Sequence, residues 1–172
     1  MVDHRERDTG RSIRRVSPSE AKSLLDLGYF YVDVRSVEEF HDRHPKGALN
    51  VPIAAPMTGN APLAAASSAE MGAEGPSGAA FLDAMRQLFS RDAKIVVGCA
   101  TGVRSLRAAK LLAAAGFTDV VDQRAGIDGA RGPFGNLVEP GWSDAGLPVT
   151  SGADAGSFAE LQGKADAARA RS

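Results

Sequence analysis

Only one cysteine and three histidines occur among the 172 residues of the chain. An internal disulfide needs two cysteines, and zinc knuckles and iron–sulfur clusters need several cysteine or histidine ligands. The composition therefore excludes all three kinds of site. The lone cysteine, Cys99, is then either a buried apolar residue or a reactive thiol, and the function depends on which of these it is.

The sequence also lacks an excess of charge and any long apolar run. With 20 basic and 21 acidic residues the net charge is -1, which argues against nucleic-acid binding and against attachment to an anionic membrane surface. No apolar run approaches the roughly 20 residues that a membrane span needs. Residues 1–15 are rich in arginine but carry Asp3, Glu6 and Asp8, which a transit peptide would avoid. We therefore expect a cytoplasmic protein without membrane contact.

The length predicts one domain, and a hydrophobic content of 44% is sufficient for a buried core. We place this domain at residues 13–150. Residues 1–12 are expected to form a flexible N-terminal tail, and residues 151–172, rich in alanine, glycine and charge, a disordered or weakly helical C-terminal tail. Glycine and proline recur without periodicity at residues 54–78, which predicts a long surface loop.

Within the domain, apolar runs of strand length alternate with helical patterns. Two Ser-x-x-Glu capping boxes predict helix starts, and apolar residues spaced at three and four positions predict further helices. Strands that alternate with helices through short connections indicate an α/β fold with a mostly parallel central sheet and helices on both faces. The strand signals lie at residues 29–34, 48–53, 94–98 and 119–122, and the helical signals at 17–28, 36–40, 81–89 and 106–116.

Cys99 directly follows the apolar strand 94–98, and a helix begins a few residues later. Ligands of open α/β sheets bind at the carboxyl ends of the strands, where a tight loop and a helix N-terminus direct N–H groups inward. Such surroundings, with Arg104 nearby, favour the thiolate form of a cysteine. Gly102 allows a positive φ in the loop. These neighbours favour a reactive thiol over an inert core cysteine.

Several segments together resemble the rhodanese family of sulfurtransferases, in its single-domain form. The resemblance extends over about residues 13–150, in the order of the family's motifs. The segments are residues 32–40 (VDVRSVEEF), 44–52 (HPKGALNVP), 99–104 (CATGVR), 116–120 (GFTDV) and 146–149 (GLPV).

The resemblance implies a sulfurtransferase that carries sulfur as a persulfide on Cys99. A small sulfur-containing anion such as thiosulfate would be the donor, and cyanide or a thiol, including a protein thiol, the acceptor. Such a covalent mechanism needs neither a metal nor an organic cofactor. The loop that would bind the substrate and the persulfide consists of Ala100, Thr101, Gly102, Val103 and Arg104.

Three other functions compete with this interpretation of the Cys99 loop. Phosphatases and arsenate reductases of the same fold use a Cys-x5-Arg loop, whereas Arg104 follows Cys99 after four residues. A cysteine-protease dyad would need a local signature that is absent. A non-catalytic persulfide carrier or partner-binding module needs the same loop, and the neutral Ala100 and Thr101 give it some weight. The donor stays open between thiosulfate and mercaptopyruvate.

Two further pairs of residues allow a structural and a functional reading. Asp33 and Arg35 are expected to form an ion pair at the sheet edge, and Arg35 could instead help to attract an anionic donor. His41 and His44 are three residues apart, which suits one helical face. No third ligand is near in the sequence, so we expect surface or capping histidines rather than a metal site.

Overall fold

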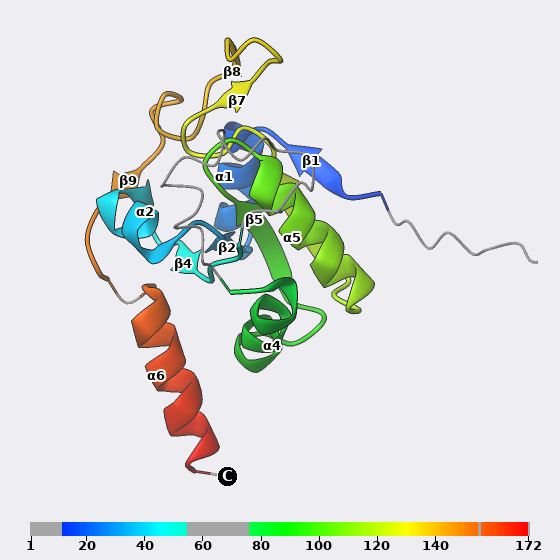
Figure 1. Ribbon diagram of the computed structural model, residues 1–172, viewed down its shortest axis with the longest axis vertical. Helices are drawn as coiled ribbons and strands as arrows, with labels where there is room; N and C mark the ends of the chain where they lie inside the picture. Colours follow the sequence, from blue (N-terminus) through cyan, green and yellow to red (C-terminus); the bar gives the residue numbers. More distant parts are fainter. Residues whose placement is uncertain (1–11, 55–75, 155, 172) are drawn as a thin grey trace, which may run out of the picture.

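The computed structural model describes residues 12–54, 76–154 and 156–171. Most of the predicted N-terminal tail and of the predicted loop 54–78 lies outside the described residues. The central sheet has five strands in the order β1-β6-β5-β2-β4, and every neighbouring pair is parallel (Figure 1). Its strands are β1 (Arg14–Val16), β2 (Phe30–Asp33), β4 (Leu49–Asn50), β5 (Lys94–Gly98) and β6 (Asp119–Gln123).

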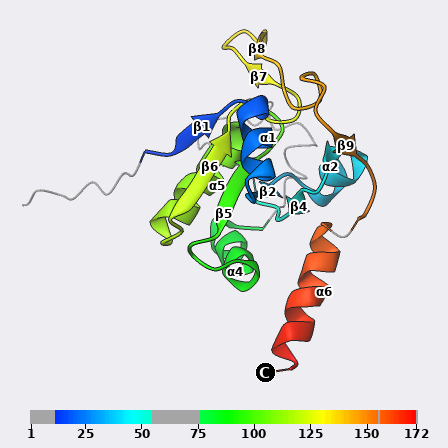
Figure 2. The same cartoon turned by 180° about the vertical axis from the view of Figure 1, so that it is seen from behind.

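Helices cover both faces of this sheet, as the sequence predicts. Ile95 and Val97 of β5 pack in one apolar cluster with residues of three helices, and Val96 packs in a second cluster with residues of two others. Figure 2 shows α1 on the face turned away from the viewer of Figure 1. The first cluster includes residues of α4 (Gly78–Leu88), α5 (Val103–Ala114) and α6 (Phe158–Arg169). The second includes residues of α1 (Pro18–Asp26) and α2 (Val37–Asp42).

The two predicted capping boxes are present. The Ser17 hydroxyl accepts a hydrogen bond from the Glu20 backbone N–H, and the Glu20 carboxylate accepts one from the Ser17 N–H. Ser36 and Glu39 make the same reciprocal bonds at the start of α2. The second box fixes the position of Glu39, which becomes important at the site described below.

The short strands outside the central sheet are not predicted by the sequence pattern. They form two antiparallel pairs, in which two or three residues are too few to show an alternating pattern. The pair β7–β8 is a hairpin that projects beyond the sheet (Figure 1). These strands are β3 (His44–Pro45), which pairs with β9 (Val149–Thr150), and β7 (Ala130–Arg131), which pairs with β8 (Leu137–Glu139).

The C-terminal segment is largely helical, which is one of the two forms expected for residues 151–172. Residues Phe158–Arg169 form the three-turn helix α6, and Leu161 on it is 7% exposed and belongs to the core. The Gly156 carbonyl accepts a hydrogen bond from the N–H of Asn50 in β4. Leu161 is the one buried residue of the helix, so the apolar periodicity was too weak to predict it. Among the described residues, no helix is long and apolar enough to cross a membrane.

Candidate active site

Cys99 lies where β5 ends, and the loop that follows leads into α5. Gly102 is the N-cap of α5 and has a φ of 90°. The loop is fixed to the chain segment after β6, since the Cys99 carbonyl accepts a hydrogen bond from the Ile127 N–H and the Ala100 carbonyl one from the Asp128 N–H. The predicted strand-to-helix loop at the carboxyl edge of the sheet is therefore formed.

The sulfur of Cys99 makes two polar contacts. The Gly102 N–H donates a hydrogen bond to Sγ over 3.1 Å, and the Ser105 hydroxyl oxygen lies 3.4 Å from Sγ. Cys99 is 2% exposed, whereas Ala100 and Thr101 are partly exposed. The sulfur thus lies just beneath the loop surface, with a backbone donor directed at it.

The conformation of Gly102 is required by its surroundings. A Cβ atom at this position would lie 2.0 Å from the backbone carbonyl oxygen of Arg124. The positive φ excludes most side chains for a separate steric reason. The loop therefore needs glycine here both for its backbone angle and for close packing against the segment after β6.

Arg104 does not extend freely towards the sulfur but is bound to Glu39 of α2. Its two terminal nitrogens each donate a 2.8 Å hydrogen bond to one carboxylate oxygen of Glu39. These bonds raise the pKa of Arg104, burial opposes the increase, and the nearby Cys99 sulfur adds to it. The predicted cation is near the thiol, but Glu39, which we had not predicted as a site residue, neutralises much of its charge.

The charge of Glu39 is itself maintained by this pair. Burial favours the neutral form, but the hydrogen bonds from Arg104 and from the Ser36 backbone prevail and lower the pKa of Glu39 to about 2. The Glu-Phe pair of the family resemblance, residues 39–40, was the sequence signal from which this partner could have been found.

Asp33 and Arg35 form a buried ion pair at the end of β2, the strand beside that of Cys99. Asp33 pairs in register with Gly98, the residue before the cysteine. Asp33 is 1% and Arg35 4% exposed, and Arg35 Nη2 donates over 2.7 Å to Asp33 Oδ2 and over 2.6 Å to the Arg43 carbonyl. This geometry agrees with the structural reading. An attraction of Arg35 for a donor stays a prediction.

A second polar group, absent from the sequence-based candidates, lies behind the loop. Arg15 of β1 donates from Nε to Asp122 Oδ2 over 2.6 Å and from Nη2 to the Gly102 carbonyl over 3.1 Å. Asp122 on β6 and Ser105 on α5 are both fully buried. These three residues support the loop from the side opposite Glu39.

His44 corrects the expectation of a surface histidine, although it does cap a helix. Its ring is fully buried and stacks on Phe40 at a centroid distance of 3.6 Å. Nδ1 lies 2.6 Å from the Phe40 carbonyl at the end of α2, and Nε2 lies 2.8 Å from Asp154 Oδ2. Within the part of the chain that the structure describes, no group of three or more potential metal-ligating side chains gathers.

Comparison with known proteins identifies the family. The model of the rhodanese-like domain matches residues 17–131, which contain the whole Cys99 loop. The chain belongs to the rhodanese-like domain family. The predicted resemblance and fold class are thereby confirmed.

Plant members of the family are similar in sequence. "Thiosulfate sulfurtransferase 16, chloroplastic" of Arabidopsis thaliana is 38% identical over 108 residues, which cover 62% of this chain and 78% of the relative. "Thiosulfate sulfurtransferase 18" of the same organism is 36% identical over 61% of this chain and 68% of the relative. "Rhodanese-like domain-containing protein 17", also from this plant, is 33% identical over 61% of this chain and 60% of the relative. The cytoplasmic compartment stays a prediction.

Solved structures share the fold. The crystal structure of Rv0390 from M. tuberculosis has a TM-score of 0.58 and 22% sequence identity, and the match covers 82% of this chain and all of that one. A thiosulfate sulfurtransferase from Pseudomonas aeruginosa has a TM-score of 0.55 and 22% identity, over 92% of this chain and 24% of the other. At this identity the likeness concerns the fold alone.

Proposed function

We propose that this rhodanese-like domain is a sulfurtransferase that moves a sulfane sulfur from a donor such as thiosulfate to a thiophilic acceptor through a persulfide on Cys99. The observation that carries the proposal is the position of Sγ at the end of β5, 3.1 Å from the Gly102 N–H and beside Arg104. The names of the plant relatives support the same reaction class.

The reaction has two displacement steps. The Cys99 thiolate attacks the outer sulfur of thiosulfate, the new S–S bond forms, the old S–S bond breaks, and sulfite leaves with the bonding electron pair. A cyanide ion or a thiolate then attacks the outer sulfur of the persulfide and releases the Cys99 thiolate. Backbone N–H groups of the loop would stabilise the anionic outer sulfur, because fixed dipoles need no reorganisation during the reaction.

Loop length supports sulfur over phosphorus as the transferred element. Arg104 is the fifth residue after Cys99, and the next position is Ser105, whose hydroxyl is 3.4 Å from Sγ. The phosphatase-type loop implied by the family resemblance has one residue more. We therefore infer that the loop encloses an anion of sulfur size rather than a tetrahedral phosphate or arsenate.

One observation favours the second candidate, a persulfide carrier that receives sulfur from a partner protein. The arginines around the loop already have carboxylate partners: Arg104 with Glu39, Arg35 with Asp33, Arg15 with Asp122 and Arg124 with Glu139. Ala100 and Thr101 add no charge. Among the described residues, these four arginines therefore offer little unpaired positive charge to attract a free dianion such as thiosulfate.

A cyanide–thiosulfate assay and protein mass spectrometry separate the two candidates. We expect the wild type to form thiocyanate and Cys99→Ser to form none, with a mass gain of one sulfur on the wild type after thiosulfate treatment. A wild type that gains this mass from a persulfide-donating protein but never turns over thiosulfate would establish the carrier. Thiocyanate formation that persists in Cys99→Ser would refute the Cys99 persulfide in either role.

A further inference from the structure

Ser105 faces the reactive sulfur from the first turn of α5. Its hydroxyl oxygen lies 3.4 Å from Cys99 Sγ, and its side chain is fully buried. A serine hydroxyl has one proton to donate and can also accept hydrogen bonds. With a thiol, Ser105 can accept from the S–H group, and with a thiolate it can donate its own proton to the sulfur.

Asp122 lies behind Ser105 with an incomplete set of hydrogen bonds. Its strand, β6, pairs with β5, and Asp122 is in register with Val97, two residues before Cys99. Oδ2 accepts the hydrogen bond from Arg15, but Oδ1 has no hydrogen-bond partner of normal length among the described residues, although it is buried. A buried carboxylate oxygen without a donor is costly.

The Ser105 hydroxyl is near enough to Asp122 to affect the carboxyl group. Burial raises the pKa of Asp122, and the nearby Ser105 hydroxyl and the Arg15 guanidinium partly offset this increase. The hydroxyl thus has two acceptors in its surroundings: the Cys99 sulfur at 3.4 Å, and the buried Asp122 carboxylate, whose Oδ1 has no hydrogen-bond partner among the described residues. It has only one proton to give.

We propose that Ser105 is a positioning residue for the Cys99 nucleophile and that Asp122 competes with the sulfur for the Ser105 hydroxyl proton. This inference rests on the proposed function, for which the thiolate is the attacking species. With its proton turned to Asp122, Ser105 accepts from the S–H group and stabilises the resting thiol. With its proton turned to Sγ, it stabilises the thiolate and leaves Asp122 Oδ1 unsatisfied.

Other charged and titratable groups also face the sulfur. Arg104 on α5 and Tyr31 on β2 both have a pKa that is raised in part by the Cys99 sulfur, and Glu39 on α2 holds Arg104. Asp33 is the last residue of the neighbouring strand β2, and Arg35 follows two residues later. All of these groups are unchanged in the variants below, so a difference between variants reports on Ser105 and Asp122.

The test measures how readily Cys99 ionises. Because the chain contains one cysteine, thiolate absorbance in the ultraviolet and alkylation by iodoacetamide both report on this residue alone. We expect Ser105→Ala to move the midpoint of the absorbance titration to higher pH and to slow alkylation at neutral pH by about tenfold, because a hydrogen bond to a charged group is lost. We expect Asp122→Asn to move the midpoint to lower pH and to speed alkylation by about threefold or more, because a competing charge is removed.

The double variant Ser105→Ala/Asp122→Asn identifies competition, because removal of the Asp122 charge would by itself favour the thiolate. Competition predicts that Asp122→Asn has no further effect once the Ser105 hydroxyl is absent, whereas an independent charge effect predicts the full shift and would overturn the role of Asp122. Asp119→Asn is the matched control: it lies on the same strand, and its carboxylate accepts from the Tyr29 hydroxyl over 2.9 Å, away from Cys99. Shifts of the same sign in both variants, shifts no larger than the control's, or a wild-type thiol that never titrates would overturn the proposal. Should Ser105→Ala fail to fold, Ser105→Gly, which also removes the hydroxyl, takes its place in the single and the double variant.

Neither measurement requires sulfur transfer, so the two proposals can fail separately. A wild type that takes up no sulfur from any donor would remove the proposed function and leave the titration result standing. A wild type that forms the persulfide, with variants that shift in the same direction, would keep the function and remove the role of Asp122.

Discussion

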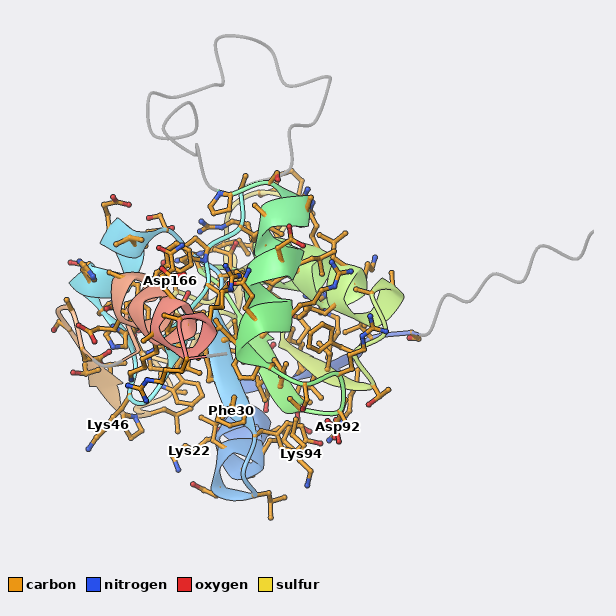
Figure 3. All side chains as sticks on the ribbon, turned by 90° about the horizontal axis from the view of Figure 1, so that it is seen from below. Lys22, Phe30, Lys46, Asp92, Lys94 and Asp166 are labelled. Atoms are coloured by element: carbon orange, nitrogen blue, oxygen red, sulfur yellow. The ribbon has the colours of Figure 1, made fainter. Side chains whose placement is uncertain are left out.

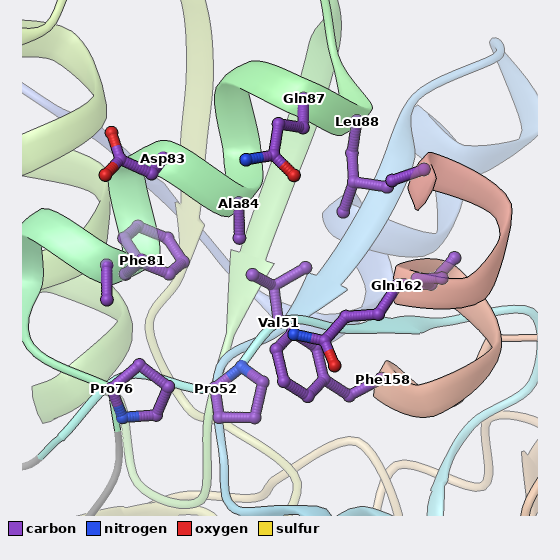
Figure 4. A pocket seen from close by; sticks show the side chains of 13 residues that line it. Val51, Pro52, Pro76, Phe81, Asp83, Ala84, Gln87, Leu88, Phe158 and Gln162 are labelled. Carbon is purple, nitrogen blue, oxygen red and sulfur yellow. The ribbon is translucent and has the colours of Figure 1, made fainter. Parts of the chain in front are cut away.

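The two sides of the molecule are stabilised in different ways. At the carboxyl edge of the sheet, around the Cys99 loop, buried charged groups such as Asp33, Arg35 and Asp122 depend on specific partners. On the side formed by α4 and α6, seen from below in Figure 3, the helices contribute apolar side chains to the core: Phe81 and Met85 from α4 and Leu161 from α6. A pocket between these helices is lined mainly by apolar side chains such as Val51 and Phe158, together with the polar Asp83, Gln87 and Gln162 (Figure 4).

The loop edge depends on the geometry of specific ion pairs and hydrogen bonds, whereas the side of α4 and α6 depends on the volume that its side chains fill. A buried charge is tolerated only while its partner is present, so a single substitution at the loop edge leaves the remaining charge unpaired. A buried apolar side chain is replaceable by another of similar size. Substitutions on the two sides should therefore differ in how much stability they cost and in which replacement side chains are tolerated.

The largest effect is expected at the loop edge, from Asp33→Ala. The substitution leaves the Arg35 guanidinium, 4% exposed, without its carboxylate, and removal of one partner of a buried pair costs about 3–5 kcal/mol. Urea unfolding measures this loss. Asp83→Ala, which removes an exposed ion pair with Arg86 on α4, is the control and should cost less than about 1 kcal/mol. Equal losses in the two variants would contradict the distinction.

A smaller effect is expected on the apolar side, from Leu161→Ala. Leu161 is 7% exposed and anchors α6 to the core, so we expect a loss of about 2–3 kcal/mol in the free energy of unfolding. Leu161→Met keeps most of the volume and should cost less than about 1.5 kcal/mol. An unchanged stability for Leu161→Ala would mean that α6 does not contribute to the core in solution.

The smallest effect is expected from the Glu39–Arg104 ion pair at the loop edge, whose contribution to stability depends on pH. The pKa of Glu39 is about 2 in the folded protein against an ordinary value of 4.5, so its contribution is full above about pH 4.5 and disappears as the pH falls towards 2. The carboxylate is partly exposed, and after allowance for solvent screening we expect a contribution of about 1–2 kcal/mol.

The measurement is the difference in unfolding free energy between wild type and Glu39→Gln as a function of pH. This difference should become smaller as the pH is lowered from about 4.5 towards 2. Asp26→Asn, which removes the exposed pair with Lys22 on α1, should change stability by at most about 0.5 kcal/mol at neutral pH. A Glu39 difference that stays constant down to pH 2 would show that the Arg104 pair contributes no pH-dependent stability.

Local features of the fold and site were predictable from the sequence, and distant pairings were not. The capping boxes, the buried strand β5 and the need for glycine at position 102 each follow from a few neighbouring residues. The contact between Arg15 and Asp122 joins residues 107 positions apart. No periodic pattern encodes such a pair, so the groups behind Ser105 emerge only once the strands are placed side by side.

The same principle explains why β1 and the exact position of α6 were not predicted at the ends of the domain. Strand β1 has three residues, of which Val16 alone is buried, and α6 has Leu161 alone. One apolar anchor gives no repeat for a pattern to detect, yet it is sufficient to hold a short element against an existing core.

The tight packing of Gly102 against the Arg124 carbonyl also limits how this loop can vary. A side chain at position 102 is excluded, whereas Ala100, Thr101 and Val103 expose part or most of their surface. A combinatorial library aimed at a new sulfur donor thus has three variable positions in the loop, which give on the order of 8,000 sequences, few enough to screen with some tens of thousands of clones. The backbone proposed to bind the sulfur and the side chains that would select its donor can therefore vary independently.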